Sequence, residues 1–193
     1  MAGIFLLKSQ IRFMKLTEDD FWLLIYLLFF GAIAGGKILY VAVEYRAFLS
    51  GEIHFFRDFR YGFIFFGGFF GVVLMGFVAQ RRLKFNYLEM ADYFSVALPL
   101  GHAIGRLGCL AAGCCYGKPT KLPWGLALGG HPACTTPEWL WGIPLHPTQV
   151  YESLGSLGIF LFLLRVVLPR IRKGKIIAGT AFFGYIALYC LLR

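Results

Sequence analysis

Five apolar stretches of roughly membrane-spanning length constrain the fold of this chain more than any other feature. They lie at about residues 21–43, 62–79, 87–110, 150–168 and 176–192. A helix needs about 20 apolar residues to cross the hydrocarbon core of a bilayer. Only 15% of the 193 residues are charged, whereas a soluble domain carries about 25%. We therefore predict a single all-α membrane domain over residues 1–193, a polytopic integral membrane protein with about five transmembrane helices.

The basic residues form short clusters between the apolar stretches and indicate the orientation of the chain. The clusters are Lys8, Arg12 and Lys15, then Arg81, Arg82 and Lys84, then Arg170, Arg172, Lys173 and Lys175. With five spans all three clusters lie on one side, which the positive-inside tendency makes cytoplasmic. The N-terminus and an interfacial lead-in, residues 1–20, are then cytoplasmic, and a cysteine-rich loop, residues 111–147, lies outside. Because membrane topology explains these basic clusters, the net charge of +9 does not indicate a nucleic-acid partner.

Residues 99–120 carry most of the chemically active side chains of the sequence. His102 and Arg106 lie in the third apolar stretch, four residues apart, and therefore share one face of a helix. A cation within a membrane segment is costly, so such a residue indicates a functional site. His102 is either a general base or a packed histidine bonded to a neighbouring carbonyl.

Each of the first two apolar stretches carries a face suited to close packing against another helix. Each contains two glycines four residues apart, a spacing that allows close helix contact. The pairs are Gly31 with Gly35 and Gly67 with Gly71. Lys37, Tyr40 and Glu44 follow as a polar stripe at helical spacing. Lys37 either extends to the membrane interface or contacts a lipid headgroup.

Three sequence blocks occur in a characteristic order: FFGG at 65–68, GRLGCLAAGCCYG at 105–117 and HPTQVYE at 146–152. In this order they resemble the prolipoprotein diacylglyceryl transferases, membrane enzymes that attach diacylglycerol to the lipobox cysteine of bacterial prolipoproteins. The resemblance covers residues 17–188 and is that of a divergent, shortened member corresponding to the middle five spans of the family. It implies a multi-pass protein of the bacterial inner membrane, a phosphatidylglycerol-like phospholipid donor and a lipoprotein or other acceptor. We expect no cofactor.

The resemblance also implies roles for individual residues. Arg106 corresponds to the family arginine that holds the phospholipid headgroup, and a guanidinium can bind phosphate in bidentate fashion. The implied substrate-binding residues are Arg106, Lys37, Tyr40, Gly67, Gly68, Gly105, Gly108, Gly117, His146, Gln149 and Tyr151. The chain departs from the family at Phe66, where the family has a catalytic histidine, and near Tyr189, where it has an arginine. Cys109 and Cys114 replace a family asparagine and glutamate.

These departures leave the acid–base residues of the site open. The candidate catalytic residues are His102, Arg106, Cys114, Cys115 and Glu152. His102 is the natural substitute base, with His146 and His131 as alternatives. Glu152 is either a buried catalytic carboxylate or a structural partner of Arg106 or Lys37.

The clustered cysteines allow three interpretations. Cys134 forms a disulfide with Cys114 or Cys115 and so fixes the long loop. Alternatively, a thiolate near Arg106 is a nucleophile that holds a covalent lipid intermediate. Thirdly, the thiols bind a metal ion; because their C-x4-C-C spacing is not a standard zinc pattern, we expect no metal.

The function that the sequence favours is a lipid-modifying transfer of a phospholipid-derived diacylglyceryl group to an acceptor, which could be a thiol. The alternative is a non-catalytic lipid-binding or thiol-redox membrane protein that kept the fold but lost the family histidine and glutamate.

Overall fold

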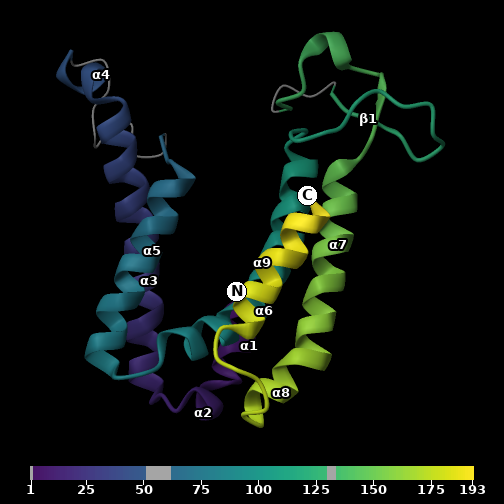
Figure 1. Ribbon diagram of the computed structural model, residues 1–193. Helices are drawn as coiled ribbons and strands as arrows, with labels where there is room; N and C mark the ends of the chain where they lie inside the picture. The colour runs from purple at the N-terminus through teal and green to yellow at the C-terminus, as the bar shows by residue number, and fades with distance from the viewer. Residues whose placement is uncertain (1, 51–61, 130–133) are drawn as a thin grey trace. The chain divides into compact units, whose positions relative to one another are not determined.

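The computed structural model describes residues 2–50, 62–129 and 134–193. The regular elements of the described residues are helices, apart from one pair of two-residue strands, β1 (Leu126–Ala127) and β2 (Pro144–Leu145), which run antiparallel (Figure 1). This confirms the all-α class predicted from the sequence. Two compact units are present, one formed by Ile11–Tyr87 and the other by Met1–Gln10 with Leu88–Arg193.

The unit Ile11–Tyr87 is built around two long helices. It contains α2 (Ile11–Met14), α3 (Glu18–Val43), α4 (Tyr45–Leu49) and α5 (Phe65–Leu83). Thr17 caps α3, because its hydroxyl accepts a hydrogen bond of 3.1 Å from the backbone N–H of Asp20. Three acidic residues in the first turn also stabilise the helix, because their negative charges lie at the positive end of the helix dipole.

Glycines allow α3 and α5 to lie side by side at close range (Figure 1). A Cβ atom built on Gly35 would lie 2.9 Å from the Cα of Gly71, closer than real Cβ contacts come. Gly31 and Gly67 face the opposite backbone in the same way. The helix contact that the glycine spacing predicted is therefore confirmed.

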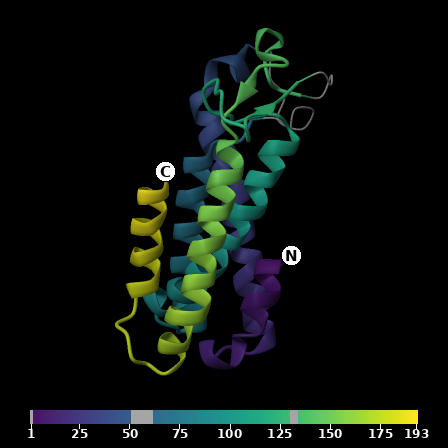
Figure 2. The ribbon, with the colours of Figure 1, turned by 90° about the vertical axis from the view of Figure 1, so that its right-hand side faces the viewer.

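The other unit contains the remaining long helices. In chain order these elements are α1 (Ala2–Lys8), α6 (Tyr87–Ala111), η1 (Glu138–Leu140), α7 (Thr148–Phe162), the π-helical turn η2 (Leu163–Val167), α8 (Leu168–Arg172) and α9 (Thr180–Leu192). The segments α7, η2 and α8 form one continuous helix, Thr148–Arg172. The loop between α6 and α7 carries both strands and lies at the end of this unit where α6 ends and α7 begins (Figure 2).

A buried carboxylate fixes the start of α9. Asp92 of α6 accepts hydrogen bonds from the backbone N–H groups of Gly179, at 2.7 Å, and Phe182, at 2.9 Å. The first N–H groups of a helix have no partner within the helix, so Asp92 satisfies two of them from a neighbouring element. This contact ties the last helix to α6.

Among the described residues, three helices are long and apolar enough to cross a membrane. They are Glu18–Val43, Tyr87–Ala111 and Thr148–Arg172, which agrees with three of the predicted spans. α5 begins at Phe65 rather than at 62, because Gly62 has a φ of +68° and Ile64 is extended. α9 is apolar but has only 13 residues. The chain is an integral membrane protein, whereas the count of five spans and the single domain remain predictions.

Replacement of Gly35 by leucine tests the contact between α3 and α5. We expect Gly35→Leu to destabilise the protein by about 1–3 kcal/mol, because the larger side chain overpacks the contact. The measurement is the thermal midpoint of the purified protein in detergent. Gly158→Leu is the matched control, since Gly158 lies on α7 with no described atom within 4 Å of an added Cβ. Equal midpoints for the two variants would contradict the close contact.

Candidate functional site

An ion pair joins α6 to α7 at the centre of the candidate site. The Nη2 of Arg106 lies 2.8 Å from Oε1 of Glu152, and both side chains are largely buried, at 17% and 16% exposure. The hydroxyl of Tyr189, on α9, donates to the same carboxylate oxygen at 3.0 Å. The structure thus contains the pairing of Glu152 with Arg106, one of the alternatives raised by the sequence.

His102 lies one turn before Arg106 on α6 and contacts the same helix, α9. Its Nδ1 is 2.6 Å from the hydroxyl of Tyr185. Its ring also lies against the ring of Tyr189, with 4.8 Å between the centroids. The shared face predicted for His102 and Arg106 is confirmed, and this face meets two tyrosines and a glutamate.

Side chains at the start of α7 donate hydrogen bonds to the backbone of the loop segment that follows α6. The Nε2 of Gln149 donates to the carbonyl of Cys114, and the hydroxyl of Thr148 donates to the carbonyl of Cys115, both at 2.6 Å. Gln149 is fully buried, and its Oε1 has no hydrogen-bond partner among the described residues. One turn further on, the hydroxyl of Ser153 donates to the carbonyl of Ala103 on α6.

His146 and Tyr151 belong to a second polar group at the start of α7. The Nδ1 of His146 lies 3.3 Å from the hydroxyl of Tyr151, which also accepts a bond of 2.8 Å from the indole N–H of Trp124. The backbone N–H of Gly117 donates to the carbonyl of His146 at 2.9 Å. The imidazole of His146 is therefore hydrogen-bonded to Tyr151 beside the loop. His131, the third candidate base, lies outside the described residues.

The remaining predicted binding residues divide between the two units. Gly105 and Gly108 lie on an exposed face of α6, where no described atom is within 4 Å of an added Cβ. Four others belong to the unit Ile11–Tyr87, namely Lys37, Tyr40, Gly67 and Gly68. In that unit the Nζ of Lys37 lies 5.8 Å from the centre of the Tyr40 ring. The two glycines are buried where α5 faces α3.

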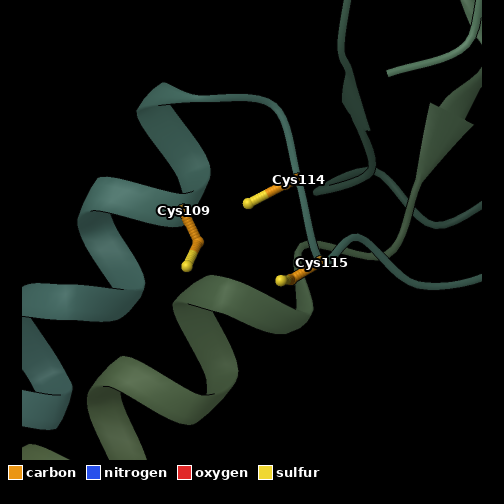
Figure 3. A group of neighbouring side chains, drawn as sticks. All are labelled: Cys109, Cys114 and Cys115. Atoms are coloured by element: carbon orange, nitrogen blue, oxygen red, sulfur yellow. The ribbon is translucent and has the colours of Figure 1, made fainter. Parts of the chain in front are cut away.

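All five cysteines lie in the described part of the chain, and all are free thiols. The disulfide considered for Cys134 is thus not formed. Two threonines fasten the loop instead, because the backbone N–H of Thr135 donates to the carbonyl of Ala112 and the hydroxyl of Thr136 to that of Gly113. The sulfur atoms of Cys109, Cys114 and Cys115 lie within 4.8 Å of one another (Figure 3).

Comparison with known proteins identifies the family of this chain. A family model described as prolipoprotein diacylglyceryl transferase matches residues 1–193. The chain belongs to the prolipoprotein diacylglyceryl transferase family. The resemblance inferred from the three sequence blocks is therefore confirmed.

Curated relatives carry the same family name. The chain is 33% identical to the phosphatidylglycerol–prolipoprotein diacylglyceryl transferase 2 of Clostridium perfringens, over 91% of this chain and 69% of that protein. It is 31% identical to the Clostridium tetani transferase, over 98% and 72%, and 34% identical to that of Geobacter sulfurreducens, over 94% and 65%. The chain thus spans about two thirds of the length of these relatives. The matches favour the transferase interpretation over the non-catalytic alternative.

The sequence does not indicate the partners of Tyr185 and Tyr189, although Tyr189 lies near the position where the family has an arginine. Tyr185 and Tyr189 lie in an apolar helix that has almost no polar face, and their hydroxyls meet His102 and Glu152 only after the helices pack. The one available signal is that the two tyrosines are four residues apart, which places both on one helix face.

Two cysteines of the loop differ in acidity. Hydrogen bonds to the side chain and backbone of Thr136 lower the pKa of the Cys134 thiol from its usual value. Burial, with further contributions from Cys115 and Cys109, raises the pKa of Cys114 to about 11. Because the thiolate is the nucleophile, Cys134 is the more reactive of the two near neutral pH.

Alkylation rates test this difference. At about pH 8 roughly one in a thousand Cys114 side chains is a thiolate, so iodoacetamide should modify Cys134 well before Cys114. Raising the pH towards about 11 should bring the two rates together. The measurement is a time course of peptide masses from the purified protein. Thr136→Val should slow the reaction at Cys134, and faster modification of Cys114 at the lower pH would contradict the assignment.

Proposed function

We propose that this protein is a membrane diacylglyceryl transferase that takes its lipid from phosphatidylglycerol and transfers it to the cysteine thiol of a prolipoprotein. The names of the curated relatives, phosphatidylglycerol–prolipoprotein diacylglyceryl transferases, support both substrates. The observation that carries the proposal is the contact between Arg106, Glu152 and Tyr189 inside an apolar helical bundle. A guanidinium in such a place stays charged and can bind the phosphate of a headgroup in bidentate fashion.

The transfer requires one bond to form and one to break. The acceptor thiol loses its proton to a base, and the sulfur attacks the glyceryl carbon that carries the phosphate ester. The bond between this carbon and the ester oxygen breaks, and glycerol phosphate leaves with the electron pair. Catalysis therefore needs a base for the thiol and a cation for the phosphate.

Arg106 is the residue proposed to hold the phosphate. Its bond to Glu152 uses one hydrogen on Nη2, and a guanidinium carries five N–H donors in a fixed fork. It can therefore hold the carboxylate and a phosphate together. Glu152 and Tyr189 orient the guanidinium, because the tyrosine hydroxyl donates to the oxygen that accepts from Arg106.

His102 is the proposed base. Its Nδ1 lies against the hydroxyl of Tyr185, and this contact fixes the orientation of the ring. In the tautomer in which Nδ1–H donates to the hydroxyl oxygen of Tyr185, the opposite nitrogen, Nε2, is unprotonated and would accept the proton of the acceptor thiol. Tyr185→Phe is accordingly expected to disturb the base more than the headgroup site.

We further propose that the site opens to the outer side of the bacterial inner membrane. The distribution of lysine and arginine supports a cytoplasmic N-terminus and an extracytoplasmic loop at 111–147. In that orientation Arg106, in the penultimate turn of α6, lies near the outer end of its helix.

Substitution of Arg106 tests the headgroup role. We expect Arg106→Ala to lower peptide-dependent release of glycerol phosphate by about 10²–10³-fold, because the leaving phosphate loses its cation. The assay uses the purified full chain, phosphatidylglycerol vesicles and a lipobox peptide.

Arg170→Ala is the matched control, because Arg170 is exposed on α8 and donates to its own helix. It should keep the activity of the unaltered protein. Arg106→Lys separates charge from geometry and should recover only part of the loss. Full activity in Arg106→Ala would remove the headgroup role, and no release by the unaltered protein would favour the non-catalytic alternative.

Cysteine accessibility in whole cells tests the orientation. A membrane-impermeant maleimide should label Cys134, which lies in the loop, without permeabilisation. In a variant whose cysteines are replaced by serine, a new cysteine at Lys173 should react only after the membrane is opened. The reverse pattern would contradict the proposed orientation.

A further inference from the structure

The three-cysteine cluster at the end of α6 takes no part in the proposed transfer. Cys109 lies in the last turn of α6, and Cys114 and Cys115 lie in the turn that follows. Figure 3 shows the three side chains directed towards a common space between the end of α6 and the start of α7. All pairs of sulfur atoms are within 4.8 Å, and all three residues are free thiols. Sulfur atoms that converge at such distances can share one metal ion.

The backbone that presents these sulfurs adopts an unusual conformation. Gly113 has a φ of +65° and Cys115 a φ of +60°. A non-glycine residue with positive φ is uncommon, and it persists where the surrounding structure imposes it. Here the chain turns back on itself within four residues, which brings Cys114 and Cys115 beside Cys109. Gly113 and Cys114 themselves form a common glycine cap of α6, in which the backbone N–H of Cys114 donates to the carbonyl of Cys109 at 3.0 Å, so the unusual conformation is that of Cys115.

The start of α7 supports the cluster from behind. Thr148 and Gln149 hold the carbonyls of Cys115 and Cys114, so two of the three cysteines are fixed by hydrogen bonds to a neighbouring helix. These bonds fix the backbone from which the side chains of Cys114 and Cys115 project.

The ligand set decides which ion would fit. Thiolates are soft ligands that prefer monovalent copper and zinc to magnesium or calcium. A closed zinc site is tetrahedral and needs four ligands, whereas three side chains converge in the described part of the chain. Three sulfurs alone match a soft monovalent ion with low coordination number. We propose that Cys109, Cys114 and Cys115 form a three-thiolate binding site for a copper(I) ion.

Binding exchanges protons for the metal. Each thiol that becomes a ligand loses its proton to solvent, and copper stays in the monovalent state, so no electron is transferred. The proposal therefore requires copper(I) but no oxidant. The copper(I) proposal does not rest on the proposed transfer, because copper binding is measured in the absence of phospholipid and peptide.

The test is a copper titration of the purified full chain in detergent. Copper(I), kept reduced with ascorbate, competes with the chelator bathocuproine disulfonate, and the expected result is about one tightly held copper per chain. Separate replacement of Cys109, Cys114 and Cys115 by serine should each weaken binding by about a hundredfold. Cys134→Ser and Cys190→Ser are the matched controls, since neither sulfur belongs to the cluster, and both should bind copper normally.

Four results would overturn the copper(I) site. One is the absence of copper binding when all five thiols are titratable. Another is equal loss of binding in the cluster variants and the controls. The third is a disulfide between two cluster cysteines in protein that is alkylated immediately on isolation. Circular dichroism and size-exclusion profiles of each serine variant separate a lost ligand from a lost fold. A bound zinc ion that copper(I) does not displace would also contradict the assignment.

Discussion

The ion pair between Arg106 and Glu152 is the interaction on which the arrangement of this site depends. A lone guanidinium or carboxylate inside an apolar bundle would be strongly destabilising, and removing one partner of such a pair leaves the other uncompensated. Here the pair joins α6 to α7, and the hydroxyl of Tyr189 adds α9 to the same carboxylate. Three helices are thus held in register by groups that also have the chemistry to receive a phosphate.

The loop after α6 depends on the same helix junction. Thr148 and Gln149, which precede Glu152 by one turn or less, hold the backbone of Cys115 and Cys114. Thr135 and Thr136 fasten the far part of the loop to the end of α6. Hydrogen bonds to backbone carbonyls therefore fix the loop in place of a disulfide, and the cysteines remain free thiols.

Much of the fold could be predicted from the sequence, because hydropathy and charge are local properties. The helix start at Thr17 and the glycine contact of α3 with α5 follow from short patterns that the structure reproduces. The Arg106–Glu152 pair was one of several possible pairings, since composition does not say which charges meet. The contacts of Tyr185 and the convergence of three sulfurs depend on tertiary packing and on the positive φ of Cys115, which no local pattern specifies.

The carboxylate of Asp92 sets the rotation of α9 as well as its starting point. Its two bonds fix Gly179 and Phe182 against α6, and Tyr185 and Tyr189 follow at three and seven positions beyond Phe182. Each residue turns an α-helix by about 100°. One inserted residue between Phe182 and Tyr185 would turn both hydroxyls away from their partners while leaving the segment equally apolar. The length of this segment is thus as constrained as its composition, although hydropathy alone would treat the two sequences as equivalent.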